Sequence, residues 1–235
     1  MNRRWPQDFD RKGVQHLLKT AGRAREAAPR MDLLSAAFIG RPYQSPILIG
    51  SAQSPEVFSA RTDRFDCVTY IETVLALSSA DAVHHFPQKL RQLRYASGQV
   101  EWNRRNHYMT EWIRHNLRNG AIQRVSGLEA TNRKTRTLDV VPGLAARRVS
   151  FNCIPKKRLL KAADKLKTGD LIFFASTRKH LDVFHCGIVI NNGHGLRLRH
   201  ASRSRGAVVE QSLPEFLNIN RMAGVIVVRP AEPLR

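Results

Sequence analysis

The amino-acid sequence predicts an α+β fold, in which helices come first and an antiparallel sheet forms from the last third of the chain. Up to about residue 120, apolar residues recur at helical spacing beside polar and basic faces. In the last third, short runs rich in β-branched and aromatic residues alternate with turn signals such as Thr168-Gly169-Asp170 and Asn191-Asn192-Gly193. Helices and strands that are segregated in this way are typical of the α+β class.

Helices are expected on both sides of an irregular connection in the first half of the chain. This connection, residues 41–56, contains three prolines together with glycine and serines, which disfavour helices and central strands. Asn119-Gly120 would end the last helix, and residues 121–168 are basic, poorly periodic and expected to be rich in loops. The expected helices cover 7–27, 31–38, 66–79, 82–95 and 103–120.

The strands of the last third are expected to form an antiparallel meander, because tight turns separate them at intervals of roughly ten residues. A short helix over 212–222 interrupts the series. The expected strands cover 171–175, 184–191, 196–202, 207–210 and 224–229. With 235 residues, the chain is long enough for one large domain or for one domain with an attached subdomain.

The charge balance is the strongest bulk signal, since 39 Lys and Arg against 19 Asp and Glu give a net charge of +20. Such a field attracts polyanions and steers anionic substrates. Nucleic acid is one candidate partner, supported by basic clusters at 133–137, 145–149 and 155–161. No helix-turn-helix pattern, zinc-finger spacing or RNA-binding signature accompanies the clusters. A solvated basic surface on an enzyme and an anionic cell envelope therefore stay open as explanations.

The sequence has no uninterrupted apolar stretch of about eighteen residues, as a membrane-spanning helix requires. Its basic N-terminus is not followed by the apolar segment of a secretory signal. We therefore expect neither a membrane span nor a signal peptide in this sequence. The three cysteines, Cys67, Cys153 and Cys186, are far apart and form no C-x-x-C pair. They predict no disulfide framework and no metal site, and leave open a single reactive cysteine.

Cys67 stands where a helix is expected to begin, directly after Asp66, which is best explained as the helix cap. Helix starts offer unpaired backbone N–H groups and the positive end of the macrodipole, which lower the pKa of a thiol. A thiolate nucleophile needs a base, and that base needs a group to orient it. His185 opens one expected strand and His200 lies near the end of the next. A hairpin would bring them together, so we predict a Cys–His–His site.

Several motifs, in order, resemble those of the NlpC-type, papain-like cell-wall peptidases, and most closely the bacterial N-acetylmuramoyl-L-alanine amidase-like branch. The resemblance covers roughly residues 31–230. The motifs are GRPY (40–43), FDCVTYIETVLAL (65–77), RYASGQVEWNRRNHYMTEWIRHN (94–116), TGDLIFF (168–174), LDVFHCGIVI (181–190), LRHAS (198–202) and GVIVVRP (224–230). Relatives more often carry a glycine-threonine-leucine turn where this chain has residues 44–56, so substrate preference carries over less well there.

The resemblance implies a papain-like core that hydrolyses an amide bond of bacterial peptidoglycan without a metal or organic cofactor. Cys67 would attack as a thiolate, His185 would act as general base and then acid, and His200 would orient the His185 ring. Tyr43 would approach the cysteine, and Asp66 would also lie beside the substrate. The HYMTEW segment would wall the cleft and supply further substrate contacts from His107, Tyr108, Glu111 and Trp112.

The resemblance also implies a single papain-like catalytic domain over 31–235. Residues 1–30 fall outside the resemblance and are expected to form a basic helical N-terminal extension. Such an enzyme would be bacterial and, without a signal peptide, either cytoplasmic or exported by a specialised secretion system to act in a periplasm. Peptidoglycan or muropeptides would be its substrate, and an immunity protein would be the partner of a secreted effector. Nothing in the sequence demands more than a monomer.

Three alternatives to cleavage of the N-acetylmuramoyl–L-alanine bond stay open. The same fold serves D-glutamyl–diamino acid endopeptidases, and related papain-like cores carry out acyl transfer on lipids or proteins. The third alternative is a basic nucleic-acid-binding protein without hydrolase activity, which the net charge of +20 motivates.

Overall fold

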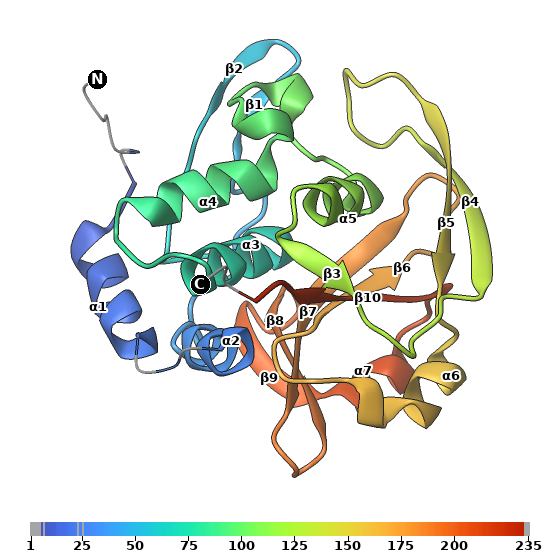
Figure 1. Ribbon diagram of the computed structural model, residues 1–235. Helices are drawn as coiled ribbons and strands as arrows, with labels where there is room; N and C mark the ends of the chain where they lie inside the picture. The colour runs from blue at the N-terminus through green and yellow to red at the C-terminus, as the bar shows by residue number, and fades with distance from the viewer. Residues whose placement is uncertain (1–5, 7, 23, 25, 233–235) are drawn as a thin grey trace.

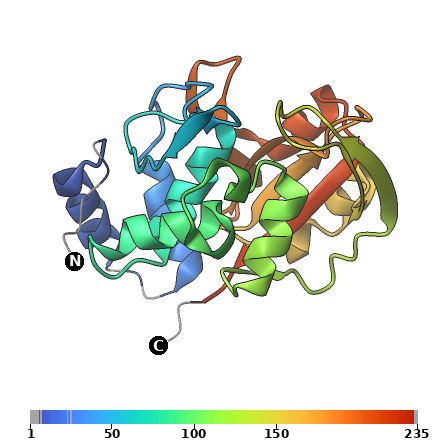
Figure 2. The ribbon, with the colours of Figure 1, turned by 90° about the horizontal axis from the view of Figure 1, so that it is seen from above.

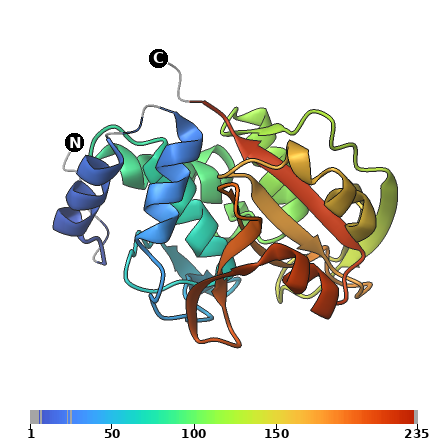
Figure 3. The same ribbon diagram turned by 90° about the horizontal axis from the view of Figure 1, so that it is seen from below.

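A six-stranded antiparallel sheet forms the centre of the protein, as a computed structural model shows (Figure 1). The structure describes residue 6 and residues 8–22, 24 and 26–232. The strand order of the sheet is β3-β10-β6-β7-β8-β9, and two hairpins, β1–β2 and β4–β5, stand outside it. Helices α1 to α5 contribute to the core on one face of the sheet, whereas α6 and α7 cover the other face (Figures 2 and 3).

The helices are α1 (Arg11–Ala21), α2 (Ala27–Ala36), α3 (Cys67–Ser78), α4 (His85–Arg94), α5 (Met109–Arg118), α6 (Lys156–Lys161) and α7 (Leu213–Ile219). The strands are β1 (Ile49–Ser51), β2 (Ser54–Val57), β3 (Ile122–Arg124), β4 (Asn132–Leu138), β5 (Arg147–Cys153), β6 (Leu171–Ala175), β7 (Val183–Asn191), β8 (Leu196–Ser202), β9 (Ala207–Ser212) and β10 (Gly224–Pro230). Short 3₁₀ helices, η1 (Ala96–Gly98), η2 (Trp102–Arg104) and η3 (Ala163–Lys165), lie between them.

Strands β6 to β9 pair in chain order, which confirms the predicted antiparallel meander. After α7 the chain crosses back, and β10 pairs with β6 on the far side of β7. Side chains alternate between the two faces along β7. Cys186 and Ile188 therefore join the core below α3, whereas Val189 joins the cluster under α6 and α7.

Helix α3 is the central helix, and ten of its twelve residues are buried. A helix that is apolar on all sides must be surrounded by protein, and α3 indeed packs against α2, α4 and the sheet. Its one buried acid, Glu72, accepts from Arg94 Nε at 2.7 Å and from Trp112 Nε1 at 3.0 Å. Arg94 also donates to the Ser59 carbonyl at 2.7 Å. The ion pair therefore links α3 to α4, and the hydrogen bond from Trp112 links α3 to α5.

Two regions that were expected to be irregular contain regular structure. Residues 41–56 include β1 and most of β2, and residues 121–168 include the β4–β5 hairpin and α6. Both predictions were wrong for the same reason. Strands that pair only with each other, outside the main sheet, bury little, so their sequences lack an apolar period; β4 reads NRKTRTL.

The N-terminal helix is shorter than predicted, since α1 covers Arg11–Ala21 of the expected 7–27. Residues 7, 23 and 25 of that range lie outside the described residues, as do residues 1–5 of the proposed extension. Val14 and Leu18 of α1 pack into the same core as α3, and α2 runs across residue 30. The division of the chain at that residue stays a prediction. In the described part of the chain, the helices are too short or too polar to cross a membrane.

The Glu72–Arg94 pair yields a stability prediction. Glu72→Gln removes the negative charge but keeps the shape, and leaves the Arg94 guanidinium buried without its counter-charge. We expect the free energy of unfolding to fall by about 3–5 kcal/mol, measured by urea titration. The control is Glu101→Gln, because Glu101 is exposed and reaches Arg104 only at 4.0 Å; its loss should stay below about 1 kcal/mol. Equal losses in the two variants would contradict a structural role for the buried pair.

Candidate active site

Cys67 is the first residue of α3, and the local sequence explains why the helix begins there. Asp66, the N-cap, accepts through Oδ1 from the Thr69 N–H at 2.7 Å, and Thr69 Oγ1 accepts from the Asp66 N–H at 3.0 Å. This reciprocal capping box fixes the start of the helix. The N–H groups of the first turn have no acceptor within a helix. The Cys67 N–H is therefore suited to stabilise an oxyanion that forms beside its own sulfur.

His185 on β7 and His200 on β8 are joined by a hydrogen bond, with 2.6 Å between His185 Nε2 and His200 Nδ1. Gly187, two residues after His185 on the same face of the strand, allows this approach. A Cβ on Gly187 would lie 3.0 Å from the His200 Cβ and 2.7 Å from Leu198 Cδ1. Any larger residue would therefore displace the second histidine from the first.

Aromatic rings shield both imidazoles from water. Phe174, opposite His185 across the β6–β7 pair, stacks on its ring at 5.9 Å between centroids. Phe216 of α7 lies 5.7 Å from the His185 ring and 5.5 Å from the His200 ring. His200 is only 3% exposed, and its burial, together with the charge of His185, lowers its pKa to about 3. His200 therefore stays neutral near pH 7.

A neutral His200 carries its proton on one of its two ring nitrogens, and the direction of the hydrogen bond to His185 depends on which one it is. His200 Nδ1 can accept from His185 Nε2–H only if the His200 proton sits on Nε2. That Nε2 is buried and has no hydrogen-bond partner among the described residues. A buried polar atom without a partner costs about 1–3 kcal/mol in either tautomer, so the site keeps this arrangement at the expense of stability.

The Cys67 sulfur lies between Cys186 and His185. A hydrogen bond with the Cys186 side chain, then a hydrogen bond with His185 and the charge of that imidazole, lower the pKa of Cys67 well below its usual value, although burial opposes them. Cys186, on the α3 side of β7, also donates to the Cys67 carbonyl at 3.2 Å. Burial raises the pKa of Cys186. Of the two sulfurs, Cys67 is therefore the one that becomes a thiolate.

Tyr43 and Asp66 complete the surroundings of the sulfur. Tyr43 bridges Phe65, two residues before the cysteine, in a parallel pairing. Burial raises the pKa of Tyr43, and the negative charges of Cys67 and Asp66 add to the effect. Burial and the charge of Cys67 likewise raise the pKa of Asp66 to about 6. The structure thus places both predicted residues close to Cys67.

The HYMTEW residues do not gather at the sulfur in the same way. Trp112 is fully buried, donates to Glu72 and packs against Phe173, so the structure places it in the core and away from solvent. Tyr108 is 2% exposed, and its hydroxyl accepts from the Val141 N–H at 3.3 Å. Both rings therefore lie beneath the surface of the predicted cleft wall and present almost no surface to a ligand.

His107 and Glu111 line a pocket of about 210 Å³ whose lining includes neither Cys67 nor His185. Glu111 forms an ion pair with Arg147 of β5. His107 Nε2 lies 2.7 Å from the Trp102 carbonyl, and burial lowers the pKa of His107 to about 4, with the charges of nearby arginines adding to the effect. The structure therefore separates these two residues from the cysteine and histidines.

Asp182 is a buried acid that the sequence reasoning missed. Its Oδ2 accepts from the N–H and the hydroxyl of Thr110, both at 2.7 Å, and its Oδ1 accepts from the Val183 N–H at 2.7 Å. A carboxylate at a helix start is stabilising, and here it fixes the beginning of α5 to the beginning of β7, three residues before His185. The LDVFHCGIVI motif could have pointed to Asp182, because a carboxylate at the edge of an apolar strand requires a hydrogen-bond partner.

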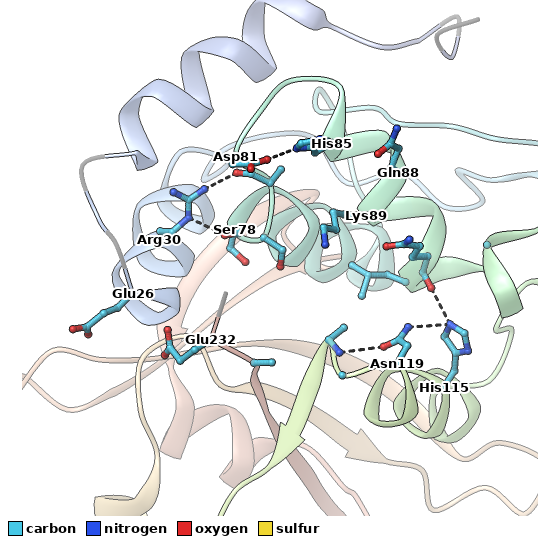
Figure 4. A pocket seen from close by; sticks show the side chains of 18 of the residues that line it. Glu26, Arg30, Ser78, Asp81, His85, Gln88, Lys89, His115, Asn119 and Glu232 are labelled. Carbon is cyan, nitrogen blue, oxygen red and sulfur yellow. Dashed lines mark hydrogen bonds and ion pairs between the residues drawn. The ribbon is translucent and has the colours of Figure 1, made fainter. Parts of the chain in front are cut away.

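A larger open cavity, of about 1580 Å³, lies between α2, α4, α5 and the end of the described chain (Figure 4). Its lining contains neither Cys67 nor either histidine of the pair. Arg30, drawn in Figure 4, donates to the carbonyls of Ser78 and Ala80 at 2.8 Å each and thereby satisfies the end of α3. Within the described ranges, no group of three or more His, Cys, Asp or Glu could hold a metal ion.

The protein is similar in fold to solved structures. An N-acetylmuramoyl-L-alanine amidase from Bacteroides uniformis ATCC 8492 is 25% identical, with a TM-score of 0.73, over 88% of this chain and 100% of that one. A Legionella pneumophila protein, described under the family name DUF1460, has a TM-score of 0.81 at 21% identity over 95% of each chain. No curated protein matches.

The family assignment rests on a longer match. Residues 33–225 match the AmiA-like family, described as N-acetylmuramoyl-L-alanine amidase-like, and this range includes Cys67, His185 and His200. Since the match spans well over half of the 235 residues, the chain belongs to the AmiA-like, N-acetylmuramoyl-L-alanine amidase-like family.

Proposed function

We propose that this protein is a cysteine-dependent amidase that hydrolyses the bond between N-acetylmuramic acid and L-alanine in bacterial peptidoglycan. The observation that carries the proposal is the series Cys67, His185 and His200, in which the thiol pKa is lowered and the two imidazoles are hydrogen-bonded. Membership of the amidase-like family supports the choice of bond. A nucleophile at a helix start, followed in the chain by a base on an antiparallel sheet, supports a papain-like core of the NlpC type.

The first half of the reaction follows from the different roles of the two ring nitrogens of His185. Since Nε2 is engaged by His200, Nδ1 is the nitrogen that takes the Cys67 proton. The resulting thiolate attacks the carbonyl carbon of the lactyl–alanine amide, and the carbonyl π electrons move to the oxygen. The Cys67 N–H then stabilises that oxyanion, an effect worth about 3 kcal/mol per donor in other hydrolases.

The second half returns the site to its starting state. The amide nitrogen takes the Nδ1 proton of His185 as its bond to carbon breaks, which releases the peptide with a free L-alanine amine and leaves a thioester on Cys67. Water then gives a proton to His185 and attacks the thioester, which releases the lactyl carboxylate and restores the thiol. His200 accepts from the same Nε2–H throughout, so it is a positioning residue that never exchanges a proton with the substrate.

The central test is digestion of purified muropeptides, followed by mass spectrometry of the fragments. Cys67→Ala should lower the rate by about 10³-fold or more, because the neighbouring Cys186 thiol, whose pKa is raised by burial, is a poor substitute for the attacking sulfur. Cys153→Ala is the matched control: this thiol is buried, donates to the Asn132 and Ala223 carbonyls, and should be dispensable for the reaction.

The fragment masses also decide the bond. Free stem peptide beginning with L-alanine supports the proposal, whereas fragments cut after D-glutamate would contradict the bond assignment and retain the thiol mechanism. If muropeptides stay intact after long incubation with the native protein, the assignment as a peptidoglycan hydrolase is contradicted.

The role of His200 predicts different effects for two substitutions. His200→Leu removes the acceptor for His185 Nε2–H and should lower kcat/KM by about 10²-fold. His200→Gln keeps a side-chain acceptor and should lose less. The pH profile of Cys67 alkylation by iodoacetamide separates positioning from folding, because its acid limb should move to higher pH in His200→Leu. An unchanged profile in a folded, inactive His200→Leu protein would contradict the positioning role.

The pKa of His200 predicts acid sensitivity of the fold. Its pKa is about 3 when folded and about 6.5 when unfolded, so between these values the unfolded chain binds the extra proton. Stability from this residue is therefore present above pH 6.5 and lost as the pH falls toward 3. Between pH 7 and pH 5 the loss is about 2 kcal/mol. Urea unfolding at both values should show a correspondingly smaller drop in His200→Gln; identical drops would refute the argument.

A further inference from the structure

The small pocket that contains His107 collects positive charge from three parts of the chain. Its five guanidinium groups belong to Arg104, Arg105, Arg114, Arg118 and Arg147, and we call it the arginine pocket. The first two come from η2 and the residue after it, the next two from α5, and the last from β5. The packing of these segments therefore holds like charges together from positions far apart in the sequence.

The negative charge at this pocket does not balance the arginines. Glu111 is the one carboxylate in its lining, and it is committed to Arg147. Arg105 pairs with Glu56 at 3.2 Å, outside the lining. Arg104 reaches the exposed Glu101 at 4.0 Å, also outside the lining. Three of the five arginines therefore have a carboxylate partner, and Arg114 and Arg118 are left for a ligand or for solvent.

Arg114 and Arg118 are the least satisfied of the five. They lie one helical turn apart on the exposed side of α5, and neither has a carboxylate within 4.0 Å in the part of the chain that the structure describes. Like charges at this spacing disfavour a helix slightly. An anion bound between them would turn that repulsion into attraction.

His107 gives an independent sign of the local potential. Burial is the main cause of its lowered pKa, but the charges of Arg105 and Arg147 lower it further. A bound anion would oppose those two charges. The imidazole also lies at the pocket wall, so its NMR signals can report where a ligand binds.

We propose that the arginine pocket binds a phosphate group, either a phosphate monoester or a pyrophosphate. A carboxylate has one charge and two oxygens, which a single arginine fork can satisfy. A phosphate carries up to two charges and three or more oxygens in different directions, which suits guanidinium groups that come from several segments. A volume of about 210 Å³ favours such a small group.

The same observations argue against a nucleic-acid strand as the occupant of the pocket. Of the three basic clusters in the sequence, only 145–149 contributes a residue to the lining, namely Arg147. The clusters at 133–137 and 155–161 lie outside it. A groove for a nucleic-acid backbone would instead need basic residues along a continuous track.

The test is calorimetric titration of the native full-length protein with pyrophosphate, inorganic phosphate and acetate at low salt. We expect pyrophosphate to bind most tightly and acetate most weakly. The double variant Arg114→Gln/Arg118→Gln should weaken pyrophosphate binding at least about tenfold, because charge-assisted hydrogen bonds are lost. The control, Arg133→Gln/Arg148→Gln, removes the same charge from exposed positions of β4 and β5 and should change binding less than about twofold.

Further arms identify the source of the phosphate group. Binding of glycerol phosphate in solution points to a soluble phosphate ester, and binding to phosphatidylglycerol but not phosphatidylcholine vesicles points to a lipid headgroup. Either supports the proposal if it depends on Arg114 and Arg118 and shifts the His107 signals. The proposal fails if pyrophosphate does not bind, if both double variants weaken it equally, or if an oligonucleotide binds more tightly and is insensitive to Arg114→Gln/Arg118→Gln. The amidase assay is independent of these outcomes.

Discussion

The contact between the first turn of α3 and the middle of β7 is the constraint on which the proposed site depends. Cys67 and His185 come from different layers, so only packing sets the distance between sulfur and imidazole. The buried side chains of α3 leave it little freedom to shift, and the Cys186 thiol reaches across to the Cys67 carbonyl. On the other side of the helix, the Glu72–Arg94 pair holds α3 against α4. The packing of the core thus fixes the positions of Cys67 and His185 relative to each other.

Burial disfavours the charged form of each residue in this site, and the partners of each residue decide which of them becomes charged. A charged group is disfavoured by loss of water unless it has a partner. The thiolate of Cys67 has two, Cys186 and His185, so its pKa falls in spite of burial. His200 has only another imidazole beside it, so burial keeps it neutral. The one charge pair that forms is therefore the one between sulfur and His185, next to the scissile bond in the proposed reaction.

The sequence was sufficient for features that depend on local chemistry and chain order. Cys67 after a capping acid, and His185 and His200 on neighbouring strands, were predicted because helix caps and strand alternation are short-range properties. Features set by tertiary packing were not predicted. Asp182 meets Thr110 across 72 residues, and Trp112 turns inward because Glu72 provides a buried acceptor; neither partner can be read from one sequence. The β4–β5 hairpin was missed because a two-stranded ribbon outside the main sheet carries no apolar period.

The net charge of +20 does not by itself indicate a ligand; the places where the fold gathers the charged residues do. Several of the 19 acids are used inside the protein: Glu72 and Asp182 are buried, and Asp170 pairs with Arg229. The pairs Glu72–Arg94 and Asp170–Arg229 each remove one positive and one negative charge, so they leave the excess of basic residues on the exterior unchanged. Coulomb interactions between exposed charges fade over roughly 8–10 Å at physiological salt, so a distant excess of arginine cannot act on one ligand. Only charges that the fold gathers within one pocket can do so, which is why the arginine pocket, and not the overall charge, is the feature with chemical selectivity.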